Sequence, residues 1–163
     1  MIQNEDLTLI GVKLGEAIAL DQGVADYCNT YFGKELAIYV APDATILPEV
    51  TDAPYLFIHD LAKREGAMNM KPEYQAIFVI GIQSKSAYAI TGNGVTVPDG
   101  QQRASELLTL VQTALNNYKG GCQPPASVEA YLPGIVGSDT SHWQAWLAAT
   151  WQLELPLGYT REF

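Results

Sequence analysis

Cysteine, histidine and long apolar runs are scarce in this chain. Its 163 residues contain two cysteines and two histidines, too few and too dispersed for a zinc site, so we expect no metal. Cys28 and Cys122 could pair, but two buried thiols in a reducing compartment are the favoured interpretation. No apolar run approaches the about 20 residues that span a bilayer, and the acidic N-terminus MIQNEDLT lacks a signal-peptide pattern. We therefore expect a cytoplasmic chain that meets no membrane.

Basic residues are also few, and they are unevenly placed. The chain carries nine Lys and Arg against 18 Asp and Glu, for a net charge of −9. Residues 1–60 hold ten of the acids and two lysines, whereas residues 61–120 hold six basic residues and four acids. Such a balance argues against nucleic-acid binding, which needs a basic face to neutralise phosphates. The asymmetry could serve contact between copies of the chain, or the acidic surface could simply keep it soluble.

The clearest pattern is an alternation near the end of the chain. From His142 to Leu157 every odd position is apolar, Trp143 and Trp151 among them, while the even positions are mostly polar or small. A period of two predicts a strand with one buried face. At about 3.3 Å per residue the run could extend roughly 50 Å, so we expect a bend or bulge near Ala148 and Ala149.

The remaining elements follow from shorter patterns. Residues 74–84 are apolar on both faces, which predicts a strand at the centre of a sheet. Other strands are expected at 36–41, 55–60 and 128–132, and helices at 7–32, with a break at 21–23, and at 101–118. Because helices do not alternate with strands, the sequence predicts an α+β fold. We expect a single domain over residues 1–163, with a mainly antiparallel sheet of four to five strands packed against two helices.

Only one pair of residues in the sequence is a candidate catalytic site. His59 and Asp60 at a strand end could act as a general base and its orienting carboxylate. A hydrogen-bonded histidine at a strand edge is the simpler interpretation, because no third group accompanies the pair. The segment from Gly92 to Gly94 lacks the lysine and the helix start of a phosphate loop and predicts a turn. We expect no catalytic residue, no cofactor and no metal ligand, and hence no enzyme.

A basic segment with methionines lies between two predicted strands, from Leu61 to Glu73. It holds three of the nine basic residues, and we expect it to form a long exposed hairpin arm. Methionine side chains adapt to a partner surface, and the basic groups would be attracted to the acidic N-terminal part of another copy. A solvated hairpin loop is the alternative. The expected contact residues are Lys63, Arg64, Met68, Met70 and Lys71.

The order of these elements, with the helix at 101–118 and the segment HWQAWLAATWQLELPLGY, resembles the tail terminator (tail completion) proteins of long-tailed phages and Mu-like prophages. The resemblance covers most of the chain as a pattern and brings no catalytic residue with it. It implies a structural α+β subunit that forms a homohexameric ring on the tail tube protein, ends polymerisation of the tube and faces the head–tail connector protein. The places it implies are the host cytoplasm during assembly and the virion tail.

Two other classes of function stay open beside this one. The first is a small cytoplasmic enzyme with a site near His59, which a pocket with a perturbed titrating group would favour. The second is a dimeric binding module, which the mass in solution would separate from a ring. A ring needs contacts between two different patches of each subunit. The acidic N-terminal part and the basic arm are two unlike patches, which suits the ring.

Overall fold

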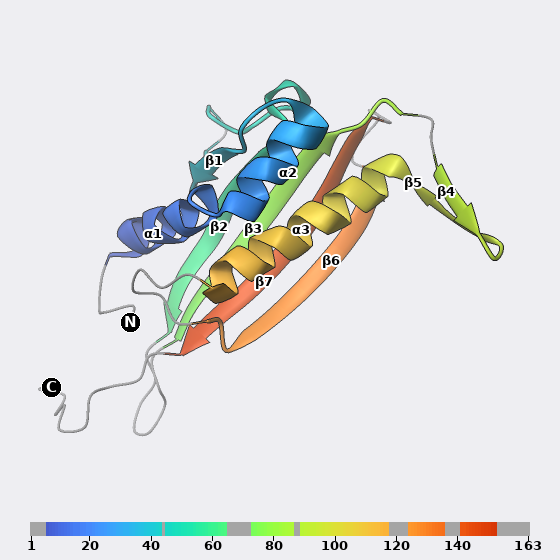
Figure 1. The fold of residues 1–163 in the computed structure, drawn as a ribbon. Coiled ribbons are helices and arrows are strands. Elements are labelled where there is room, and N and C mark those ends of the chain that lie inside the picture. The colour runs from blue at the N-terminus through green and yellow to red at the C-terminus, as the bar shows by residue number, and fades with distance from the viewer. Residues whose placement is uncertain are drawn as a thin grey trace, which may run out of the picture.

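The computed structural model describes residues 6–43, 45–64, 73–86, 89–117, 124–135 and 141–152. Five strands form one sheet in the order β1-β2-β3-β7-β6, and every neighbouring pair is antiparallel except β1 and β2. The helices α1 (Leu7–Ala19), α2 (Gln22–Phe32) and α3 (Asp99–Asn117) lie together on one side of this sheet (Figure 1). The α+β fold with a mainly antiparallel sheet is therefore confirmed. The strands of the sheet are β1 (Ala37–Val40), β2 (Tyr55–Arg64), β3 (Glu73–Gln83), β6 (Ser127–Ile135) and β7 (His142–Gln152).

Three helices cover the sheet where two were expected, because the predicted break in the first pattern separates two helices. Asp6 caps α1 (Leu7–Ala19) by accepting a hydrogen bond from the Thr8 amide at 2.7 Å. Asp21 caps α2 (Gln22–Phe32) in the same way, through the Val24 amide at 3.0 Å. A carboxylate at these positions satisfies an amide that the first turn leaves unpaired. The chain therefore restarts a helix at residue 22 instead of continuing the first.

The central strand is β3, as the sequence predicted. It pairs with β2 on one side and with β7 on the other, and the β3–β7 register runs without interruption from Gln83 opposite His142 to Glu73 opposite Gln152. Of the bend or bulge expected near Ala148 and Ala149, a bulge in this pairing is therefore excluded. The irregularities lie instead in β2 and β6, whose pairing shifts register. The part of the predicted run after residue 152 lies outside the described residues.

The core lies between the sheet and the helices. The helix α3 (Asp99–Asn117) packs across β3 and β7, while α1 packs across β1 and β2. Trp143, Leu147 and Trp151 are buried there as predicted, at 9%, 0% and 2% exposure. The predicted stripe of α3 meets them in the same cluster, formed by Ala104, Leu107, Leu108, Val111 and Leu115.

The strand β2 continues to Arg64 and β3 begins at Glu73, so both ends of the predicted arm lie in the sheet. Lys63 pairs with Tyr74 and Arg64 with Glu73, which places both basic residues in the sheet. The pairing crosses a bulge after His59, where Asp60 adopts a positive φ of 49°. A bulge shifts the alternation by one residue, which hid the second half of the strand from the sequence pattern. Met68, Met70 and Lys71 lie outside the described residues.

A small hairpin stands apart from the main sheet and was expected only as a turn. Its strands are β4 (Ala89–Gly92) and β5 (Val95–Pro98), which pair antiparallel. The predicted turn is confirmed between them, where Asn93 and Gly94 have φ of 53° and 78°. Two central residues with positive φ make the turn type that matches strand twist. The hairpin extends away from the main sheet (Figure 1). The 3₁₀ helix η1 (Val50–Asp52) precedes β2.

Candidate interaction surface

The helices of the described residues all lie on one face of the main sheet and leave its other face without a helical layer. In β7 the odd residues are buried, whereas no even residue from His142 to Gln152 is fully buried. The pairing registers place residues of β1, β2, β3 and β6 on the same side as these even residues. We call this side the open face. Its larger side chains are Tyr39, Tyr55, Phe57, His59, Ile77, Val79, Tyr131 and Trp146.

Aromatic rings follow one another across the open face. The ring centroids of Tyr55 and Phe57 are 6.1 Å apart and those of Phe57 and His59 are 5.4 Å apart. The indole of Trp146 meets His59 edge to face at 6.3 Å, which joins β7 to β2 across β3. Trp146 is 39% exposed and Tyr131 is 65% exposed. Rings of this kind are enriched where proteins contact one another.

One end of the open face is held by a polar network around Tyr55. The Gln144 amide nitrogen donates to the Tyr55 hydroxyl at 2.9 Å, and that hydroxyl lies 2.9 Å from His142 Nε2. Burial raises the pKa of Tyr55, against a smaller lowering by the Gln144 contact, so the hydroxyl stays neutral. The ring of Tyr55 fills the space where a Cβ at position 81 would lie. Gly81 thus lets the ring lie flat on β3.

The His59 and Asp60 pair predicted from the sequence does come together. His59 Nδ1 lies 3.1 Å from Asp60 Oδ2, and the two side chains are 29% and 70% exposed. The imidazole packs against Phe57 and Trp146 on an open surface. Among the described residues no cluster of His, Cys, Asp and Glu could hold a metal ion. The contact orients the imidazole, and the described surroundings supply no nucleophile or enclosed pocket for it.

The two described basic residues of the predicted arm do not form one patch. Lys63 and Arg64 are neighbours in a strand, so their side chains leave opposite faces of the sheet. Lys63 Nζ lies 5.9 Å from the centre of the Tyr74 ring, on the helical side. Arg64 is exposed and pairs across the strands with Glu73, on the side of the open face. Lys63 and Arg64 can therefore contact different partner molecules, one on each side of the sheet.

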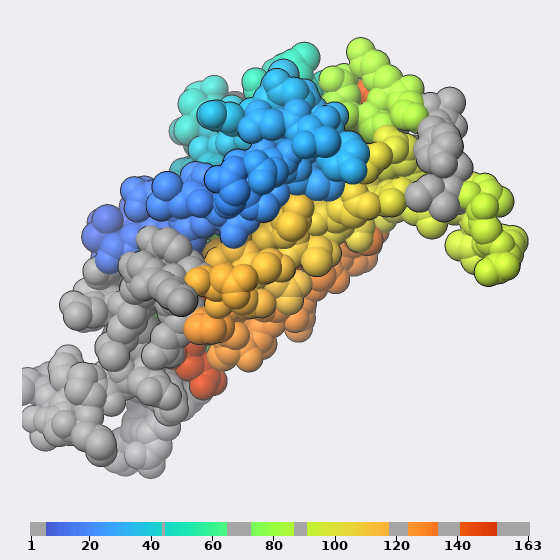
Figure 2. All heavy atoms as spheres, viewed as in Figure 1, coloured from blue at the N-terminus to red at the C-terminus, as the bar shows by residue number. Residues whose placement is uncertain are grey.

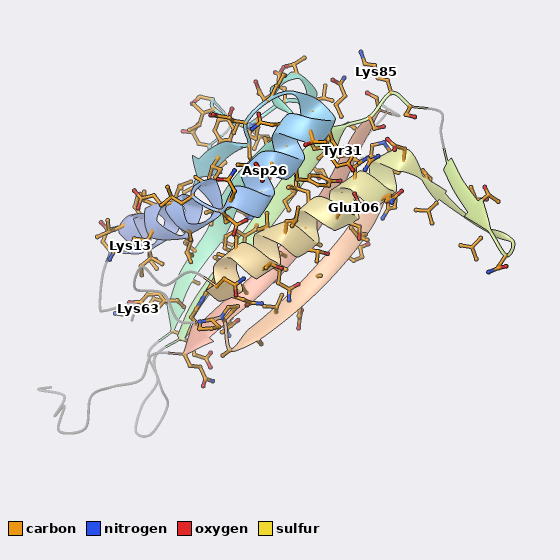
Figure 3. All side chains as sticks on the ribbon, viewed as in Figure 1. Lys13, Asp26, Tyr31, Lys63, Lys85 and Glu106 are labelled. Atoms are coloured by element: carbon orange, nitrogen blue, oxygen red, sulfur yellow. The ribbon has the colours of Figure 1, made fainter. Side chains whose placement is uncertain are left out.

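A second surface feature is a shallow groove of about 430 Å³ between α2 and α3. The Tyr27 hydroxyl donates to Glu106 Oε2 at 2.5 Å, and burial, followed by this contact, raises the tyrosine pKa. The Arg103 guanidinium lies 3.8 Å from the centre of the Tyr31 ring. Tyr31 and Glu106 project from the two helices toward this groove (Figure 3). These polar groups satisfy one another, so the groove offers few unpaired groups to a ligand. Its lining is Tyr27, Tyr31, Ser105, Glu106, Thr109 and Leu110.

Sequence reasoning missed the open face as a site. The signal was present, because Trp146 is an apolar residue at an even position of a strand whose odd positions form the core.

Comparison of the sequence with protein-family models and with curated proteins gives no match. Within the described part of the chain, no helix is both long and apolar enough to cross a membrane.

Proposed function

We propose that this chain is a structural assembly subunit of the tail terminator type. Copies of it form a homo-oligomeric ring, with six subunits as in the family it resembles, on the tube of a phage or prophage tail. The ring ends polymerisation of the tube protein and offers a surface to the head–tail connector. Its place of action is the host cytoplasm during assembly and then the virion tail. The observation that carries this proposal is the open face of the sheet.

The size of the open face suits a protein contact. Four strands of about ten residues and the short β1, at about 4.8 Å spacing and about 3.3 Å per residue, give roughly 700 Å². A stable protein interface buries about 800 Å² on each partner. The centre of the face is apolar, with Phe57, Ile77, Trp146 and Ala148. Asp60 lies beside it through its contact with His59, and Glu129 pairs with Ala148 from the edge strand β6. Copies of a chain with a net charge of −9 can approach there with little repulsion.

The His59 and Asp60 contact is the observation that favours the second candidate, a small enzyme or a dimeric binding module. A histidine oriented by a carboxylate is the usual arrangement of a general base. Against this, the pair lies on an open, aromatic surface rather than in a cleft. Within the subunit the imidazole packs edge to face on Trp146, which is a structural role.

Solution mass tests the assembly proposal directly. We expect light scattering to show one subunit mass at low concentration and a discrete multiple of it at high concentration. Trp146→Glu should shift this transition at least tenfold toward higher concentration, because a carboxylate in an apolar contact is left unpaired. Val95→Glu is the matched control, since Val95 is 62% exposed on the separate hairpin. A single subunit mass at all concentrations, in low and high salt, would contradict the proposal.

The tail-related part of the proposal needs its own test. Lys63, Arg64 and Lys71 changed together to Ser should leave folding intact and disturb the ends of tails, because the basic groups orient contact with the next subunit or the tube. Exposed ion pairs contribute only about 0.2–1 kcal/mol each, so we expect an effect on assembly rate more than on affinity. Tail lengths in electron micrographs are the readout. Tails of uniform length with the triple variant would show that these basic residues take no part in tail completion.

A further inference from the structure

We infer that the open face of one copy is covered by the outer side of α1 from the next copy. This inference rests on the proposed function and specifies the partner of the open face. A ring with one subunit type requires two different patches that fit each other. The open face is one of them, and the outer side of α1 has the properties of the other.

The outer side of α1 carries apolar side chains that the core does not use. Leu9 is 45% exposed, Val12 is 39% exposed and Leu20, the C-cap, is 78% exposed. At 100° per residue these three positions fall on one side of the helix, with Glu16 between them. The opposite side supplies the buried residues Ile10, Leu14, Ala17 and Ile18. The helix α1 thus has apolar residues on two sides, only one of which packs inside its own subunit.

This outer side is accessible in the helical layer. In Figure 2 the segment of α1 lies at the surface, beside α2, and the side chain of Lys13 extends outward from it in Figure 3. From Leu9 to Leu20 the stripe is about 16 Å long at about 1.5 Å per residue. Three neighbouring strands at about 4.8 Å spacing present a surface of similar width. The stripe therefore fits across β2, β3 and β7, where Phe57, Ile77 and Trp146 are uncharged.

A helix lying on a sheet repeats the packing that the subunit already uses on its other face. Opposite charges are also available at the contact. The outer side of α1 carries Glu16 and Lys13, and the open face carries Arg64 near one margin and Asp60 beside His59. Contact of two open faces with each other is the competing arrangement. It would bring Asp60 and Glu129 of both copies into one interface, close at two subunits and leave the α1 stripe exposed.

Disulfide trapping tests the inference. Val12→Cys and Ala148→Cys are made as separate variants with Cys122→Ser, and the two are co-expressed and then oxidised at pH 8. Cys28 does not interfere, because it is buried and its burial raises the pKa of the thiol to about 11. We expect a covalent dimer of the two variants, at least tenfold more abundant than disulfides within either variant alone. Val95→Cys with Ala148→Cys is the matched control and should give no dimer above that background.

A chain with both cysteines should form a ladder of covalent oligomers that stops at the ring size. Disulfides between two Ala148→Cys chains, without the mixed dimer, would mean that open faces meet each other and would overturn the inference. Assembly in light scattering without either disulfide would also overturn it and would leave the proposed function standing. A single subunit mass at every concentration would instead remove the proposed function, and the inference with it.

Discussion

Replacing Trp151 by alanine tests whether the closing strand forms the core. Its side chain is 2% exposed and meets Phe78 edge to face at a centroid distance of 6.3 Å. A buried aromatic side chain removes about 150–250 Å² from water, and at about 25 cal/mol per Å² this contributes roughly 4–6 kcal/mol. Measured losses for buried tryptophan are about 3–5 kcal/mol, because the site collapses in part. We expect a loss of about 3–5 kcal/mol in the free energy of unfolding.

The assay is reversible urea denaturation of the variant and the parent. The midpoint should fall while the slope stays constant, since the surface exposed on unfolding changes little. For a chain of this length the same loss lowers the melting temperature by roughly 6–20 °C. Repeating the measurement at two protein concentrations separates folding from assembly, because assembly makes the midpoint depend on concentration.

Trp146→Ala is the matched control for this measurement. It removes the same side chain from the same strand, five positions earlier and on the opposite face, where it is 39% exposed. We expect it to lower stability by less than half as much as Trp151→Ala when the protein is dilute. A loss below about 1 kcal/mol for Trp151→Ala, or equal losses for both variants, would refute the assignment of the core to the odd face.

Three further predictions follow from individual residues. Gly81→Ala should lower the free energy of unfolding by about 1–3 kcal/mol, because the new methyl overlaps the Tyr55 ring. Gly92→Ala is the control, because a methyl there has no neighbour within 4 Å and causes no such overlap. His59→Gln should leave assembly and tail completion intact, and loss of function in a folded, assembled variant would support the enzyme alternative. Burial raises the pKa of Cys28 to about 11, so the unfolded chain loses this proton first and stability should fall between about pH 9 and 11; Cys28→Ala should lessen that fall in denaturation series.

The sequence predicted a strand and its place in the sheet correctly where one hydrophobic pattern ran without interruption. The alternation through Trp143 and Trp151 predicted β7, and the apolar run at 74–84 predicted that β3 is central. The strand β2 was foreseen only to Asp60. At Asp60 the bulge shifts the alternation, so that Ile58 and Leu61, three positions apart, both face the helices. A period-two search cannot follow a strand across such a shift.

Contacts with adjacent strands determine the features that the sequence did not predict. The bulge of β2 lies after His59 and not at a glycine, and Gly81 pairs regularly with Tyr55 while the Tyr55 ring covers it. Lys63 and Arg64 were expected to act as one basic cluster, but the extension of β2 directs them to opposite faces. In each case the outcome depends on a residue of the adjacent strand, which local patterns do not contain.

The alternation of β7 also separates folding from assembly. Trp151 and Leu147 belong to the core, whereas Trp146 and Ala148 belong to the open face, although the four lie within six positions of one strand. A change at an odd position should alter the stability of the single subunit, and a change at an even position should alter the mass in solution. The two sets lie on opposite faces of the sheet and share the β3–β7 pairing, so coupling between them is expected through the strand backbone. If Trp146→Glu lowers the stability of dilute protein as much as Trp151→Ala does, the open face is part of the folding unit, and the proposal that it binds the next subunit is wrong.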